Sequence, residues 1–239
     1  MFYGIIGGLY ALDFSLSAGG GVLFGYTFTR YTLEGTVSGG GGSIRSVQNM
    51  DRFDFGGFIF LDATYAELSV SLQNGTGRYG ETVNYDSAAL PDDKGTGYET
   101  LLGISLAGKY PFVLNEKWSV FPMLGAEYLI ALVERRQPDG DKVYDRPKGD
   151  LAADMDKNGN PYPLSAWNSL LIKIGAGADY TLTRFLFLRG EFFYGFRLQT
   201  QYETGAVEMV KTMLDVSSPK LSGLTSGPSL RFALGYRFF

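Results

Sequence analysis

Apolar and polar residues alternate along this chain over stretches much longer than an ordinary strand. Between Phe14 and Phe28 the even positions are mostly apolar or aromatic, whereas the odd positions, apart from Leu23, are Ser, Gly or Thr. A period of two residues predicts a β-strand with one apolar face. Strands of soluble proteins typically run to about five or six residues. The length of this stretch therefore favours a strand that crosses a membrane.

The same alternation recurs along the rest of the chain. The least regular segment is 53–63, where Phe58 to Leu61 are apolar on both faces. We expect Phe53, Phe55, Ile59 and Leu61 to point outward there, because Asp54 and Asp62 then point inward. The predicted strands lie near residues 14–30, 53–63, 66–75, 98–110, 118–132, 166–180, 185–198 and 228–239.

Short and long connections alternate between these strands. Short links fall near 63–65, 111–117 and 181–184, and long polar links near 31–52, 76–97, 133–164 and 199–227. Outer-membrane barrels pair tight periplasmic turns with longer external loops. No stretch approaches the roughly 20 apolar residues of a membrane-spanning helix. We therefore predict a single all-β domain over 1–239, an eight-stranded antiparallel up-and-down transmembrane β-barrel.

A soluble sandwich or a lipocalin-like barrel is the competing fold, and it would reverse the two faces of every strand. The many charges opposite aromatic-rich faces favour the membrane barrel. An even number of strands places both termini on one side, which we expect to be the periplasmic side of a bacterial outer membrane. Residues 1–11 are mostly apolar but lack a basic leading segment, so they do not form a complete secretion signal.

Composition narrows the function. The net charge of −4 argues against a nucleic-acid partner, which would require a basic face. The chain contains no Cys and no His. Membrane barrels of this size that act as enzymes generally use His as a base, so we expect neither catalysis nor a cofactor.

The closing run from Ser229 to Phe239 resembles the last strand of the OmpX and OmpW families of small outer-membrane barrels. Residues 235–238 spell Gly-Tyr-Arg-Phe, the ending common in those families, and Phe239 is one residue more. The resemblance implies an eight-strand barrel in outer-membrane lipid, with Tyr236, Phe238 and Phe239 forming the signal that the barrel-assembly machinery reads. OmpX-like proteins are filled barrels with surface-interaction roles, whereas OmpW-like proteins are associated with passage of small, often hydrophobic, molecules.

The inward faces carry a nearly balanced set of charges. Four of them lie about eight residues from the short-link ends of their strands, roughly at mid-membrane, and are predicted to form a lumen charge cluster: Glu127, Lys173, Glu191 and Arg231. One interpretation is a gate or selectivity ring for polar solutes. The other is a structural network that fills a lumen scarcely wider than its own side chains, and we favour it.

Several large apolar residues also fall on inward faces, where polar residues are the norm. They would form a dry constriction, an apolar ligand niche, or simple packing in the upper lumen. The residues concerned are Leu101, Phe121, Met123, Leu129, Leu171 and Phe193.

The long link 133–164 contains a partial calcium motif. Asp154, Asp156 and Asn158 have the spacing of the first half of a calcium loop, in which alternate oxygens converge on the ion. The second half is missing, since Ser165 stands where a bidentate Glu is expected. Ordinary loop chemistry explains the motif equally well.

These observations predict a monomeric outer-membrane barrel with a plugged or narrow lumen. Its role would be structural or one of surface interaction, with a host or surface ligand bound through the loops. The alternative is an OmpW-like passive channel for small, possibly hydrophobic, molecules.

Overall fold

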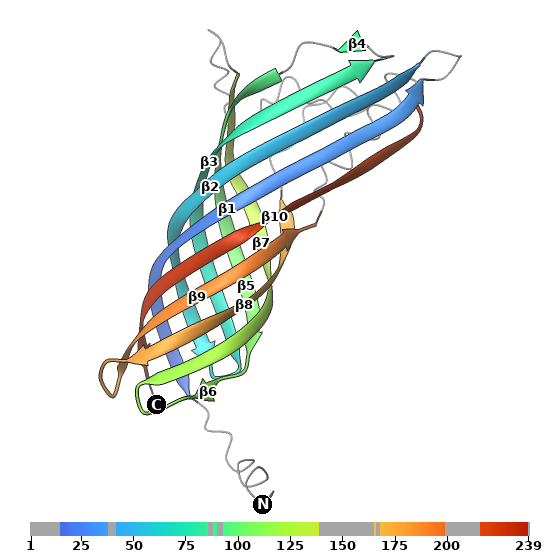
Figure 1. The fold of residues 1–239 in the computed structure, drawn as a ribbon. Helices are drawn as coiled ribbons and strands as arrows, with labels where there is room; N and C mark the ends of the chain where they lie inside the picture. Colours follow the sequence, from blue (N-terminus) through green and yellow to red (C-terminus); the bar gives the residue numbers. More distant parts are fainter. Residues whose placement is uncertain are drawn as a thin grey trace, which may run out of the picture.

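The chain forms a closed, tilted barrel of antiparallel strands (Figure 1). The computed structural model describes residues 15–37, 42–85, 88–89, 93–138, 165, 168–198 and 216–238. Within this part of the chain, no helix is long and apolar enough to cross a membrane.

Eight long strands make up the ring in the described residues, in the order β1-β2-β3-β5-β7-β8-β9-β10. Each pairs with the next in antiparallel register, and β10 pairs with β1 to close the barrel. Two short strands, β4 and β6, pair with β3 and β7 outside the ring. The predicted fold class is thereby confirmed. The bounds are β1 Leu16–Val37, β2 Ser43–Ala63, β3 Ala66–Tyr85, β4 Ala88–Ala89, β5 Asp93–Lys109, β6 Phe112–Val113, β7 Trp118–Pro138, β8 Ser169–Thr181, β9 Leu186–Arg197 and β10 Val216–Arg237.

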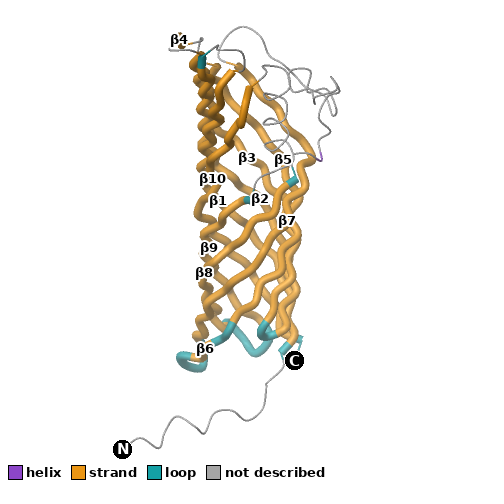
Figure 2. Tube along the Cα trace, turned by 90° about the vertical axis from the view of Figure 1, so that its right-hand side faces the viewer, coloured by secondary structure: helices purple, strands orange, loops and turns teal. Residues whose placement is uncertain are grey.

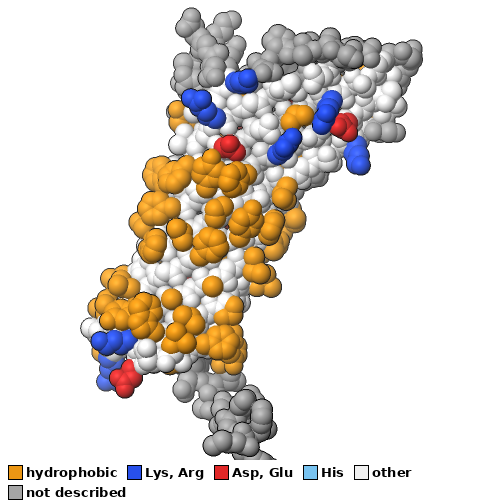
Figure 3. All heavy atoms as spheres, viewed as in Figure 1, with side chains coloured by type: hydrophobic (Ala, Val, Ile, Leu, Met, Phe, Trp, Pro, Cys, Tyr) orange, Lys and Arg blue, Asp and Glu red, His pale blue; other side chains and the backbone are white. Residues whose placement is uncertain are grey.

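Each strand turns its apolar face outward and its polar face inward, as the alternation predicted. In β2, Ile59 is 66% exposed, whereas Asp54 and Asp62 are 4% and 3% exposed. Apolar side chains cover the outer surface in broad bands (Figure 3). Apolar groups outside and charges inside are the arrangement of a membrane barrel. The soluble alternative would need the reverse.

The strands rise much higher than predicted at one end. Residues 31–37, 43–52, 76–85, 93–97, 133–138 and 216–227 were expected in loops but belong to strands. These segments are polar on both faces, a pattern that predicts a loop. Strands that project beyond a membrane have water outside, so they lose their apolar face while keeping their cross-strand hydrogen bonds. The other strand ends lie within three residues of the prediction.

The wall is therefore uneven in height. β8 and β9 have 13 and 12 residues, whereas β1, β2, β3, β7 and β10 have 20 to 22 and β5 has 17. We call the six-strand extension above β8 and β9 the upper wall. Its strands are β10, β1, β2, β3, β5 and β7, and Figure 2 shows them continuing past the level where β8 and β9 end.

The opposite, lower end carries the short links. β2 and β3 are joined by Thr64 and Tyr65 alone, and Thr64 takes a positive φ of 54°. This conformation is unusual for a β-branched residue, but the Thr64 hydroxyl bonds both backbone groups of Ser15, at 2.8 and 3.1 Å. The amide of Phe238 donates to the carbonyl of Leu16 at 2.8 Å, so the two described ends of the chain meet at this lower end.

Candidate functional site in the barrel lumen

Charged side chains and aromatic rings fill the lower half of the lumen. We call this group the lumen plug. It takes residues from seven of the eight long strands, and β1 adds Leu23 to its apolar part. Its charged members are Asp62, Glu67, Lys109, Glu127, Lys173, Asp179, Arg189, Glu191 and Arg231, and its rings are Phe58, Phe60, Phe121, Phe187 and Phe193.

Arg189 on β9 is the centre of the lower part of the plug. Its guanidinium donates to both oxygens of Asp179 on the neighbouring strand β8, at 2.8 and 2.9 Å. It also reaches across the barrel to Glu67 at 2.6 Å and to Asp62 at 2.5 Å. Lys109 from β5 donates to the same Asp62 oxygen. One arginine thus binds carboxylates from three other strands.

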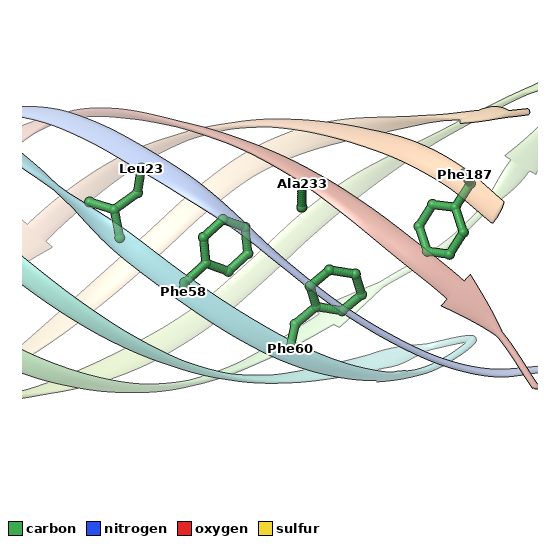
Figure 4. Close-up of a cluster of buried hydrophobic side chains, with 5 residues drawn as sticks. All are labelled: Leu23, Phe58, Phe60, Phe187 and Ala233. Carbon is green, nitrogen blue, oxygen red and sulfur yellow. The ribbon is translucent and has the colours of Figure 1, made fainter.

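Aromatic rings surround the same guanidinium. Its central carbon lies 4.7 Å from the Phe60 ring centre, 5.1 Å from that of Phe187 and 5.2 Å from that of Phe121. Phe60 and Phe187 belong to a buried apolar cluster with Leu23, Phe58 and Ala233 (Figure 4). The cation is therefore held both by carboxylates and by the negative faces of the rings.

A second layer of charges surrounds Glu127 on β7. Lys173 donates to Glu127 at 3.0 Å, and a nitrogen of Arg231 lies 3.5 Å from its other oxygen. The hydroxyl of Ser71 donates to Glu127 at 3.2 Å. Arg231 also donates to Ser69 at 3.1 Å and lies 3.9 Å from Glu67. Glu67 therefore links this layer to the Arg189 layer.

Glu191 is the least well satisfied carboxylate of the plug. Its side chain is fully buried, and neither oxygen receives a hydrogen bond within the described residues. The nearest guanidinium nitrogens of Arg189 and Arg231 are each 4.0 Å away. The plug holds five carboxylates and four cations, so its paired charges would balance without Glu191.

The side chains of the plug are large and deeply buried. Phe121, Lys173, Phe187, Phe193 and Glu67 are among the largest fully buried side chains in the described structure. An eight-stranded barrel is only wide enough for side chains to fill. The described side chains of the plug therefore pack against one another across the lower lumen.

Inward-facing glycines make room for the rings. A Cβ at Gly177 would collide with the Phe121 ring, and one at Gly235 would collide with the Phe187 ring. The inward faces of β8 and β10 are thus stripped of side chains where rings from β7 and β9 cross them. Glycines at odd positions, opposite phenylalanines on neighbouring strands, are the sequence signal that predicts where these rings fit.

A pocket of about 60 Å³ lies directly above the plug, and we call it the mouth pocket. Glu127, Lys173 and Arg231 line its floor side, and Leu23, Leu129 and Leu171 supply apolar surface. Arg52 and Asp54 line it from β2, and Arg52 forms ion pairs with Asp54, at 2.6 Å, and with Glu99 of β5. The pocket has room for a few water molecules or a very small solute.

The structure brings the four predicted cluster residues together. Lys173 and Arg231 both contact Glu127, and Arg231 also lies 4.0 Å from Glu191. The six apolar residues lie at different places: Phe121, Met123 and Phe193 share one cluster, Leu101 and Leu129 another, and Leu171 borders the mouth pocket. Tyr236 and Phe238 are exposed at the lower end, with ring centres 5.5 Å apart. Phe239 and the calcium candidates Asp154, Asp156 and Asn158 lie outside the described residues. No group of three or more carboxylates that could hold a metal ion occurs within the described ranges.

The predicted cluster omitted the largest contributor, Arg189, together with its partners Asp62 and Lys109. Asp62 was predicted to face inward, but the sequence did not show that it lies at the height of Arg189. Lys109 continues the series of inward positions 101, 103, 105 and 107 of β5, so the alternation alone predicts that it faces the lumen. Arg52 and Glu99 lie in the upper wall or at its base; Arg52 fell in a predicted loop, and Glu99 lay at the edge of a predicted strand.

No family model and no curated protein sequence matches the chain. Among solved structures, the outer membrane protein OprG from Pseudomonas aeruginosa is similar with 13% identity, a TM-score of 0.47, and coverage of 94% of this chain and 96% of OprG. The translocator domain of the autotransporter NalP from Neisseria meningitidis has 13% identity, a TM-score of 0.25, and coverage of 91% and 88%. A mutant of the monoaromatic hydrocarbon channel TodX has 7% identity, a TM-score of 0.20, and coverage of 92% and 90%. With values this low, neither a family nor a function follows from these likenesses.

Proposed function

We propose that this protein is a closed barrel of a bacterial outer membrane, with the upper wall outside the cell and the short links in the periplasm. A lipid-facing apolar surface with enclosed charges supports the membrane, and the contrast between long and short connections supports the orientation. The proposed role is structural or one of surface interaction, made through the upper wall and its loops. No catalytic step is part of the proposal.

The observation that carries this proposal is the lumen plug. Conduction would require the rearrangement of several buried ion pairs, because each charge is held by partners from other strands. Breaking a buried pair by removing one partner costs about 3–5 kcal/mol. A network of such pairs is well suited to holding strands together and poorly suited to frequent opening.

Conductance in planar bilayers tests the closed lumen. We expect folded wild-type barrels to be electrically silent, with heat-dependent gel migration used to verify folding. Defined single-channel steps from the folded wild type would overturn the closed-barrel proposal.

Cysteine labelling tests both the plug and the orientation, since the natural chain has no Cys. Ser43→Cys at the top and Asn115→Cys in a lower link are both at exposed sites. In intact cells a membrane-impermeant maleimide should label the first and spare the second. Position 229 lines the mouth pocket and position 17 is buried below it, so a small thiol reagent added from outside should modify Ser229→Cys and spare Ser17→Cys. Reversed labelling of the exposed pair would overturn the orientation.

The second candidate is a passive channel for small apolar molecules, favoured by the three leucines of the mouth pocket. Uptake of a small apolar solute into vesicles that contain the protein would favour the channel over the closed barrel. The variant Leu171→Asn changes a half-buried leucine of the pocket and should reduce uptake through it, with heat-dependent gel migration verifying that the variant folds.

A further inference from the structure

The outer face of the upper wall is rich in basic side chains. Above the apolar belt, five neighbouring strands carry exposed, outward-facing Arg or Lys residues, and the outward carboxylates described there are Glu34 and Asp51. Figure 3 shows basic side chains gathered above the upper apolar band. This excess is notable on a chain whose net charge is −4. We call this surface the basic face, and its residues are Lys220, Arg30, Arg45, Arg78 and Lys94.

The strand register gives the height of these residues above the apolar belt. Phe28 of β1 is an outward aromatic residue, 48% exposed, near the top of the belt. It lies opposite Asp51, which lies opposite Arg78, so the basic face begins at the register position of Phe28. Arg30 is two residues higher on β1, and Lys220 lies opposite Glu34, six residues higher. At about 3.3 Å per residue, the basic face covers roughly the first 20 Å of strand beyond the belt.

Three of these cations are not bound by a carboxylate of the described structure, although Asp51 lies opposite Arg78 and Glu34 lies opposite Lys220 in the strand register. Within the described part of the chain, Arg30, Arg78 and Lys220 form no ion pair. Arg45 pairs with Glu34 at 3.1 Å, but both side chains are more than half exposed. The inward charges of the same strands behave differently: Arg52 is buried and bound to two carboxylates. Unpaired cations concentrated beside a membrane surface are the mark of an anionic headgroup site.

We propose that the basic face binds the phosphates of lipopolysaccharide in the outer leaflet. The inference rests on the orientation given under Proposed function, because only that leaflet surrounds the upper wall. Guanidinium groups match phosphate geometry with paired hydrogen bonds, and Lys adds a point charge. The span of the cations along the strands suits a glycolipid, whose phosphates and acidic sugars extend well beyond its acyl chains. A phospholipid headgroup would reach only the lowest of these cations.

Binding of purified rough lipopolysaccharide to the folded full-length barrel in detergent tests this proposal, with native mass spectrometry as the readout. The triple variant Arg30→Gln, Arg78→Gln and Lys220→Gln should bind about tenfold more weakly or worse. Arg30→Lys with Arg78→Lys keeps the charges and should lose much less. Lys117→Gln with Arg184→Gln removes exposed cations at the lower end and should bind as the wild type does. Added salt should weaken wild-type binding.

A parallel titration with phosphatidylglycerol separates lipopolysaccharide from anionic lipid in general. We expect the triple substitution to change that affinity by much less. Equal losses for the two lipids, or unchanged lipopolysaccharide binding by the triple variant, would overturn the proposal. The detergent measurement does not depend on orientation, whereas Ser43→Cys and Asn115→Cys labelling does. A failed lipid site and a failed topology are thus distinguishable.

Discussion

Charged residues occupy two regions of this barrel under opposite conditions. Inside, the side chain of Arg189 is 1% exposed and bound to three carboxylates. Outside, on the upper wall, Arg45 has one partner and a side chain 59% exposed. The same chemical group is strongly constrained in one place and solvated in the other. The comparison teaches that position across the wall, and not charge content, separates residues that hold the barrel together from residues free to bind something else.

The largest effect is expected from Arg189→Ala. It would leave Asp62, Glu67 and Asp179 buried without their main cation, and we expect a loss of about 3–5 kcal/mol in the free energy of unfolding. Denaturant unfolding of the barrel in micelles measures it. Arg184→Ala, at an exposed site in a lower link, is the control and should cost under about 1 kcal/mol. Similar losses for the two variants would contradict the central role of Arg189.

An intermediate effect separates two carboxylates within the plug. Glu127→Gln weakens contacts with Lys173 and Arg231 and should cost about 1–3 kcal/mol. Glu191→Gln removes a charge whose oxygens receive no hydrogen bond, so we expect a change below about 1 kcal/mol. The same unfolding assay compares them. If Glu191→Gln proved the more damaging, the distant cations would matter more than the direct contacts.

The smallest effect is expected on the upper wall. Arg45→Gln breaks a pair that is mostly in water, so the unfolding free energy should fall by only about 0.2–1 kcal/mol, and by less in high salt. Unfolding at two salt concentrations checks this. A salt-independent loss as large as that of Arg189→Ala would remove the distinction between the two regions.

The sequence predicted the strands and their faces because alternation depends only on what lies on each side of the wall. Phe55 and Asp54 take opposite faces in any register. The height of the wall could not be predicted in the same way, since segments such as 43–52 lack the apolar outer face of the lower strands and so lose the apolar half of the pattern. Arg52 was placed in a loop for this reason.

Ion-pair partners were harder to predict than faces. Arg189 meets Asp62 across the lumen, although the two are 127 positions apart in the chain. Which residues share a level depends on the stagger between strands, and no local pattern reports that stagger. Glu127, Lys173, Glu191 and Arg231 were grouped by counting from the strand ends, and the same counting did not connect Arg189 with Asp62.

The contacts of Arg189 and Arg231 have a consequence for how the barrel is built. Asp62 and Glu67 are made early in the chain, but the arginines that neutralise them arrive on the last two strands. A partly assembled sheet that entered lipid would carry Glu67 without its arginines and Asp62 with Lys109 as its one cation among these contacts, at high cost. Sliding a strand by two residues would part the same contacts. Only a fully closed barrel with the correct stagger between strands therefore pairs both carboxylates with their arginines.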